Sequence, residues 1–210
     1  MTATGSLNPV SVEQKISVYQ WRVTMLYLVS GTSRSGKTLI AEKLMEEKQI
    51  PYMSLDWLMM GFTNGMPQLG IHDKLFPDEI AKRLWSFFKA MCESMLYLEI
   101  DYIIEGEAML PELIQELLDK YPDKIKICFV GYTDIDIDQK AQDIKTYSTR
   151  KDDWLTKESD DYIYDHIDNM VTHSRKIKDD CEKYNMSYFD TSTNFMDAIE
   201  NAKNYLLSNI

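Results

Sequence analysis

Five short apolar runs, separated by segments with helical spacing, divide most of the chain. They cover residues 25–30, 50–55, 101–106, 125–131 and 186–190. Apolar runs of this length are typical of strands buried on both faces, and strands that alternate with helices form parallel sheets. The pattern therefore predicts an α/β three-layer sandwich built around a five-stranded parallel sheet.

Helical spacing is clearest between the second and third runs. We expect one buried face on this helix, made by Ile80, Leu84, Phe87, Phe88, Met91, Met95 and Leu98. Shorter helices are predicted near residues 39–44, 111–121 and 195–206, the last with Thr191 or Ser192 as its cap.

Three polar segments interrupt this alternation. Residues 61–77 are rich in glycine and proline, which predicts an exposed loop or lid. Residues 134–183 are charged and have sparse apolar positions, as in solvent-exposed helices. Residues 1–22 are polar and precede the first run, so we expect a flexible N-terminal extension, with Met25 as an alternative start.

A complete phosphate-binding motif, Gly-x-x-x-x-Gly-Lys-Thr, follows the first run. Glycines let backbone amides surround phosphate oxygens, and the positive end of the next helix attracts the same anion. Lys37 is expected to bridge the terminal phosphates, and the Thr38 hydroxyl to ligate magnesium. We predict that ATP, or alternatively GTP, is bound with Mg2+ by Gly31, Thr32, Ser33, Arg34, Ser35, Gly36, Lys37, Thr38 and Leu39.

Composition restricts the partners of such a nucleotide site. A chain of 210 residues can bury one sizeable core, and a net charge of -11 argues against a nucleic-acid partner. No stretch is apolar for long enough to predict a membrane span, and no secretory signal is recognisable. A homodimer remains possible on this composition.

The three cysteines, Cys92, Cys128 and Cys181, are far apart in the sequence and lie in apolar or helical surroundings. No two of them have metal-binding spacing, so we expect buried free thiols in a reducing, cytoplasmic compartment.

Carboxylates that end the predicted strands are the next candidates, because ligands of parallel sheets collect at this edge. Glu105 ends the third strand and could hold the magnesium ion, with Glu107 and Asp101 as lesser candidates. Asp56 follows the second strand and could accept the proton of an acceptor hydroxyl. Asp56 could equally cap the helix that Trp57 begins.

Phosphate transfer also needs cations that close over the developing charge. Arg150 and Arg175 are our candidates within the polar segment, because a guanidinium grips phosphate oxygens in two places. Arg34 and Arg83 are further possibilities. The three histidines, His72, His166 and His173, lack metal-ligand spacing, and we interpret them as solvated.

The order of these features resembles the nucleoside-monophosphate-kinase-like branch of the P-loop phosphotransferases. Residues 103–111 include Glu105, Gly106 and Pro111 and look like the Glu-Gly-x-x-x-x-Pro segment of 2-phosphoglycerate kinases. The resemblance covers the chain from Met25 onward. It implies a P-loop kinase-like domain over residues 23–210, with a lid at approximately 134–184 and an adenine site near Thr191 and Ser192.

The chain departs from adenylate kinases at residues 105–108, where their Asp-Gly-Phe-Pro-Arg segment is replaced, and no arginine closely follows Asp56. We therefore predict a magnesium- and ATP-dependent kinase that phosphorylates a small-molecule acceptor. Two alternatives stay open: an adenylate-type nucleoside monophosphate kinase, and a nucleotide-binding switch module that phosphorylates nothing.

Overall fold

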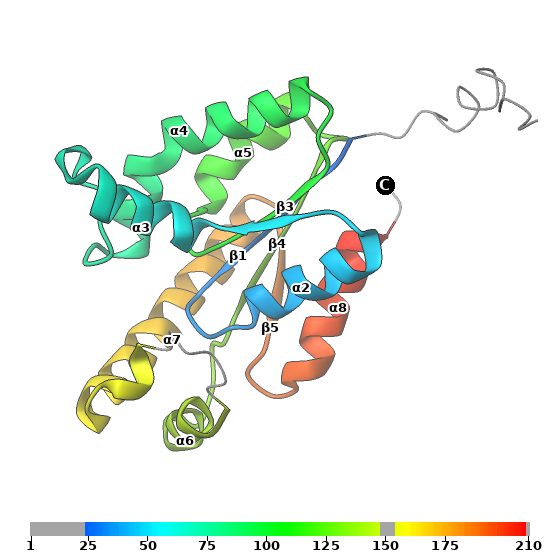
Figure 1. Cartoon of the computed structure of the whole chain (residues 1–210). Coiled ribbons are helices and arrows are strands. Elements are labelled where there is room, and N and C mark those ends of the chain that lie inside the picture. Colours follow the sequence, from blue (N-terminus) through cyan, green and yellow to red (C-terminus); the bar gives the residue numbers. More distant parts are fainter. Residues whose placement is uncertain (1–23, 148–153, 209–210) are drawn as a thin grey trace, which may run out of the picture.

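The computed structural model describes residues 24–147 and 154–208 (Figure 1). The predicted N-terminal extension, residues 1–22, and the candidate Arg150 lie outside the described residues.

A five-stranded parallel sheet forms the centre of the molecule. Its spatial order is β2-β3-β1-β4-β5. All four strand pairs are parallel, which confirms the predicted fold class. The strands are β1 (Leu26–Gly31), β2 (Tyr52–Ser54), β3 (Tyr102–Glu105), β4 (Ile125–Gly131) and β5 (Ser187–Asp190).

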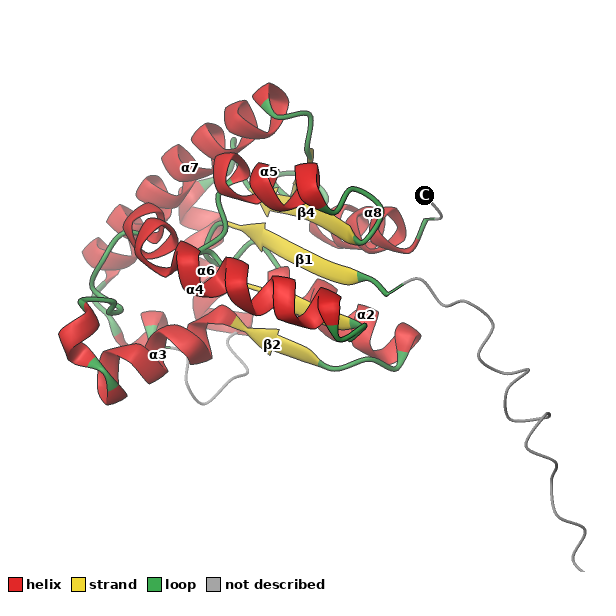
Figure 2. Ribbon diagram, turned by 90° about the horizontal axis from the view of Figure 1, so that it is seen from above, coloured by secondary structure: helices red, strands yellow, loops and turns green. Residues whose placement is uncertain are grey.

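Helices cover both faces of this sheet (Figures 1 and 2). One face is covered by α2 (Lys37–Lys48) and α8 (Phe195–Leu207). The other is covered by α4 (Pro77–Tyr97), α5 (Pro111–Lys120) and the second half of α7 (Asp160–Lys183). The remaining helical segments are α3 (Leu55–Gly65), η1 (Pro67–Leu69), α6 (Ile137–Tyr147) and η2 (Leu155–Lys157).

Each face of the sheet has its own apolar core, because successive strand residues point to opposite sides. Leu28 and Ile104 pack with α4, α5 and α7, whereas Val29 and Ile103 pack with α2 and α8. The predicted three-layer sandwich follows directly from this alternation, since the strands are apolar on both faces.

The polar segment from 134 to 183 has two structural roles, and only one of them was predicted. Its first part, α6, η2 and the start of α7, lies beyond the carboxyl ends of the strands and packs around Ile144, Leu155 and Ile163 (Figure 1). Further along α7, Ile177 and Cys181 are buried against the sheet. The prediction of solvent-exposed helices is wrong for this second half, since a few well-spaced apolar residues suffice to bury one stripe.

The prediction of an exposed loop at residues 61–77 is wrong for its first part. Helix α3 continues to Gly65, and η1 follows at once. Phe62 is buried and packs edge-on against Phe87 at a centroid distance of 5.4 Å. This apolar contact outweighs the small helix-breaking tendency of Gly61, which costs only about 1 kcal/mol in a helix interior.

Two details of the predicted helices also need correction. Phe87 of α4 is 45% exposed, and Leu98, which follows the last residue of α4, is 63% exposed, so both lie outside the buried face formed by Ile80, Leu84 and Phe88. Helix α8 begins after Asn194, which makes no side-chain capping bond, so neither Thr191 nor Ser192 is its cap.

All three cysteines are buried and free, as predicted. Burial raises the pKa of Cys92 to about 12, so this thiol stays protonated and inert at neutral pH. Among the helices of the two described ranges, none combines the length and the apolar character needed to cross a membrane.

At Gly31, where β1 ends, the chain allows no side chain. Its φ is +135°, and a Cβ atom would lie 1.7 Å from the Val130 carbonyl oxygen of β4. We expect Gly31→Ala to lower the free energy of unfolding by about 3 kcal/mol or more, because backbone strain adds to a backbone clash. Urea denaturation measures this change.

Gly61→Ala is the matched control, because no atom lies within 4 Å of the added Cβ. In the helical interior of α3, this change should raise the free energy of unfolding by about 0.5–1 kcal/mol. Equal stabilities of the two variants would contradict the close approach of β1 and β4.

Candidate active site

The phosphate-binding motif forms the turn between β1 and α2. Gly36 precedes α2 in a left-handed conformation with φ 98°, and its added Cβ would lie 2.4 Å from Ile199 Cδ1. Arg34 also has a positive φ of 59°. These backbone angles, available at low cost mainly to glycine, turn the loop so that it leads directly into the amino end of α2.

Side chains behind the loop hold it in place. Tyr132 donates its hydroxyl to the Ser33 carbonyl at 3.0 Å, and Lys140 Nζ donates to the Arg34 carbonyl at 3.1 Å. Ser35 Oγ donates to the Thr32 carbonyl at 2.8 Å. On the other side, Thr32 Oγ1 lies 3.0 Å from Ser174 Oγ of α7. The loop is therefore preorganised by the fold.

Lys37 is the cation whose charge acts on both Asp56 and Glu105, and it is 7% exposed. Its Nζ donates to the Thr32 carbonyl at 2.6 Å and lies 3.4 Å from Glu107 Oε1. An ammonium that is this deeply buried needs such partners to stay charged.

Glu105 ends β3 beside Ser54 of β2 and is 3% exposed. Burial raises the pKa of this carboxyl above its usual range, and the nearby Asp56 raises it further. Lys37 and hydrogen bonds with the Ser54 and Thr38 side chains oppose this increase. Thr38 and Glu105, the two predicted magnesium ligands, therefore lie within hydrogen-bonding reach of each other.

Asp56 lies in the first turn of α3, next to the same group. The cap of this helix is Ser54, whose hydroxyl accepts a hydrogen bond from the Asp56 amide at 3.3 Å. The alternative reading of Asp56 as the cap is therefore wrong. Much of the Asp56 surface is accessible to solvent. The pKa of its carboxyl is nevertheless raised, chiefly because surrounding protein atoms withdraw it from water; the charge of Lys37 lowers this pKa, and that of Glu107 raises it.

Sequence reasoning undervalued Glu107. It is two residues beyond β3 and forms an ion pair with Lys37. The signal available in the sequence was its position just past a strand end, which is where site residues of parallel sheets gather.

Asp101, the other lesser candidate, lies just before β3 at the opposite edge of the sheet, where it accepts a hydrogen bond from the Met25 amide at 2.7 Å. Asp101 is therefore excluded from the site.

Two of the predicted arginines, Arg175 and Arg83, bind partners other than the site carboxylates. Arg175 is exposed on α7, and its Nε donates to the Thr133 carbonyl at 2.9 Å. Arg83 donates to the Gly70 carbonyl at 2.6 Å and lies 3.7 Å from Glu79. Their catalytic roles stay predictions, as does that of Arg150.

The predicted adenine residues help to join β4 and β5. Thr191 is buried and donates its hydroxyl to the Gly131 carbonyl at 3.1 Å. Ser192 Oγ accepts hydrogen bonds from the Thr133 and Asp134 amides at 2.9 Å and 3.1 Å. These bonds shape the loop before α8, while an adenine contact stays a prediction.

The prediction of solvated histidines is wrong for His166 and His173. His173 Nε2 lies 3.0 Å from Asp78 Oδ1, which ties α7 to the first turn of α4. His166 Nε2 is buried and has no hydrogen-bond partner among the described residues. Burial lowers the pKa of His166, the charge of Glu107 raises it and that of Arg34 lowers it. Both histidines lie on the inner side of α7, which polar composition could not reveal.

The residues present fit a nucleotide and its metal ion. The positive-φ glycines, the amino end of α2 and Lys37 offer donors to phosphate oxygens. Within residues 24–147 and 154–208, no group of three or more His, Cys, Asp or Glu side chains could hold a metal ion by itself. Thr38 and Glu105 thus suit an ion that brings phosphate oxygens as its other ligands.

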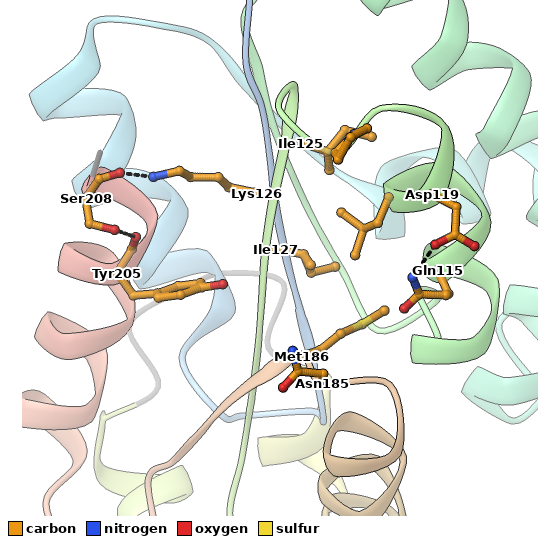
Figure 3. Close-up of a pocket in the computed structure, with 11 residues that line it drawn as sticks. Gln115, Asp119, Ile125, Lys126, Ile127, Asn185, Met186, Tyr205 and Ser208 are labelled. Atoms are coloured by element: carbon orange, nitrogen blue, oxygen red, sulfur yellow. Dashed lines mark hydrogen bonds between the residues drawn. The ribbon is translucent and has the colours of Figure 1, made fainter. Parts of the chain in front are cut away.

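A cavity lies at the opposite edge of the sheet. It has a volume of about 680 Å³ and is lined by the start of β4, by Asn185 and Met186 just before β5, by Gln115 and Asp119 of α5, and by Tyr205 of α8 (Figure 3). This edge carries the amino ends of the strands and lacks the phosphate-binding loop. The cavity therefore does not belong to the candidate site.

Three solved structures with a similar fold carry the names of kinases. A gluconokinase from Sinorhizobium meliloti 1021 superposes with a TM-score of 0.54 and 15% identity, covering 89% of this chain and 93% of that chain. A shikimate kinase from Bacteroides thetaiotaomicron has a TM-score of 0.53 and 14% identity, covering 88% and 99%. A sugar kinase from Janibacter sp. HTCC2649 has a TM-score of 0.52 and 16% identity, covering 87% and 94%.

The chain therefore has the fold of the P-loop kinases, as its sequence motif predicts. No protein-family model matches the chain, and no curated protein matches its sequence. The similarity to these solved structures therefore concerns the fold.

The raised pKa of Glu105 predicts a pH-dependent stability change. The folded protein disfavours the ionised form of Glu105. The contribution of Glu105 to the free energy of unfolding is therefore largest below the pKa that this carboxyl has in the unfolded chain, and it is lost as the pH rises through the higher pKa of the folded state. We expect Glu105→Gln to raise the free energy of unfolding at pH 8, without nucleotide, by about 0.5–2 kcal/mol. This gain should shrink at acidic pH.

Thermal denaturation at several pH values measures this difference. Glu182→Gln makes the same chemical change on an exposed part of α7 and should have no such pH profile. A loss of stability in Glu105→Gln at pH 8 would show that the charged carboxylate is favourable where it lies.

Proposed function

We propose that the protein is an ATP-dependent kinase that transfers the terminal phosphate to a small metabolite in the presence of Mg2+. The observation that carries this proposal is the convergence of Lys37, Glu105 and Asp56 at the carboxyl edge of the sheet. A nucleotide-binding loop alone would be compatible with a switch module. The additional strand-end carboxylates support chemistry on an acceptor.

The phosphate-binding loop, residues 31–38, would hold the triphosphate through its backbone amides and Lys37. Leu39 continues this loop into α2, and Thr191 and Ser192 are proposed to lie near the adenine. Thr38 and Glu105 would hold the magnesium ion, which supplies charge neutralisation on the phosphate oxygens. Lys37 would leave Glu107 and bind the terminal phosphate oxygens instead.

Asp56 is proposed as the residue that accepts the proton of the attacking hydroxyl. A bond forms between the hydroxyl oxygen and the terminal phosphorus, while the bond from that phosphorus to the bridging oxygen breaks and ADP leaves. The raised pKa of Asp56 suits this role, because a stronger base accepts the proton more readily. Arg150 or Arg175 would neutralise charge from the lid, residues 134–184.

The cellular setting is part of the same proposal. Three buried free thiols are compatible with a reducing, cytoplasmic compartment. No nucleic-acid or membrane partner is required for this reaction.

Lys37→Ala should reduce ATP affinity at least about 100-fold, because the site loses its central cation and leaves three neighbouring carboxylates unbalanced. Isothermal titration calorimetry with Mg-ATP measures the loss. Lys43→Ala is the matched control, since Lys43 lies on the same helix, is partly exposed and pairs with Glu200. Unchanged ATP affinity in Lys37→Ala would refute the nucleotide site.

Asp56→Asn should leave ATP affinity within a few-fold of wild type and reduce phosphoryl transfer about 10²–10⁴-fold, the usual contribution of a general base. Single-turnover transfer from radiolabelled ATP separates the two quantities. Helix α3 keeps its Ser54 cap in this variant, so folding should be preserved. An equal loss of ATP affinity and turnover would assign Asp56 to nucleotide binding instead.

A further inference from the structure

Lys37 is shared among more carboxylates than phosphate transfer requires. Glu107 forms its ion pair, and the charges of Glu105 and Asp56 both interact with it. In the proposed reaction Glu105 supports the metal ion and Asp56 accepts a proton. Glu107 has no assigned task and remains an additional negative charge.

Nucleotide binding changes the surroundings of Glu107. Lys37 can bind phosphate oxygens only by weakening its 3.4 Å contact with Glu107 Oε1. The Glu107 side chain is 24% exposed, so it is partly withdrawn from water. A carboxylate that loses its cation in such a place needs a new donor, because an unpaired charge is costly there.

Among the described residues, cations of the facing helices α4 and α7 have partners other than Glu107, and Arg175 of α7 donates to the Thr133 carbonyl. His166 lies close enough to Glu107 for its pKa to respond, but burial lowers that pKa, so the ring is neutral at pH 7. Lys176 of α7 binds Asp78 and Asp180. Arg83 of α4 binds Glu79 and the Gly70 carbonyl. These two cations are already engaged.

We propose that the acceptor is a neutral polyhydroxy compound or an amine-bearing one, and that Glu107 accepts a hydrogen bond from its hydroxyl or ammonium group. The inference rests on the proposed kinase function and deepens it. Once Lys37 binds the phosphate oxygens, an acceptor with a carboxylate or phosphate at this position would face the negative charges of Glu107 and Asp56. Glu107 therefore selects the acceptor by charge.

The test uses hydroxyl compounds in sets that share a carbon skeleton and differ in charge. One set is glucose, glucosamine and gluconate, and a second is glycerol, 2-amino-1,3-propanediol and glycerate. The full-length protein, Mg-ATP and each compound are incubated, and ADP release above the buffer rate gives kcat/KM. We expect the neutral or ammonium member to exceed the anionic member at least about tenfold in kcat/KM.

Glu107→Gln keeps the size and hydrogen-bonding reach of the side chain but removes its charge. In this variant we expect the ratio between neutral and anionic members to fall several-fold toward one. Glu182→Gln on the exposed surface of α7 should leave the wild-type ratio unchanged. A purely structural role for Glu107 would lower all rates together and keep the ratio.

A faster anionic member, equal rates within each set, or no turnover of any member would overturn the charge selection. So would an unchanged ratio in Glu107→Gln. These outcomes are distinct from failure of the kinase proposal, which is shown by absent ATP binding or by Lys37→Ala behaving as wild type. Phosphorylation of gluconate or glycerate at a rate equal to or above that of its neutral partner, with loss of this activity in Lys37→Ala, would refute the inference and retain the kinase.

Discussion

The burial of one ammonium group organises the candidate site. Lys37 begins α2 directly after the turn of the phosphate-binding loop, and its side chain is held inside the protein instead of extending into water. A buried cation must be paired, and the Thr32 carbonyl, Glu107, Glu105 and Asp56 provide the compensating charge. These four partners come from three separate parts of the chain, which the carboxyl ends of β1, β2 and β3 bring together.

The close approach of backbone at the sheet edge makes this arrangement possible. Gly31 lets β1 end against the Val130 carbonyl, and Gly36 lets α2 begin against Phe195 and Ile199 of α8. A larger residue at either point would push the loop away from the sheet or the helix. The position of Lys37 is thus determined by close packing on both sides of the loop, against the β4 backbone at Gly31 and against α8 side chains at Gly36.

The sequence allowed the phosphate-binding loop, the five strands and the parallel sheet to be predicted, because each depends on contiguous residues or on apolar runs. The roles of single polar residues were harder to predict. Asp56 and Ser54 are both good capping residues, and only the position of the helix start distinguishes them. The pairing of Glu107 with Lys37 joins residues 70 positions apart. Such a contact can be predicted only when it is known that β3 lies beside β1 in the sheet.

Helix α7 shows why composition misled in the polar segment. Its charged residues are numerous, yet Ser174, Ile177 and Cys181 lie on one stripe that faces the sheet. One such residue, Ser174, contacts Thr32 of the phosphate-binding loop and also accepts a hydrogen bond from the Tyr132 amide. The helix that carries the proposed lid is therefore bonded to the loop that it would cover. Any movement of the proposed lid would involve only the part of α7 before Ser174, because movement of Ser174 itself or of the residues after it would break these buried contacts.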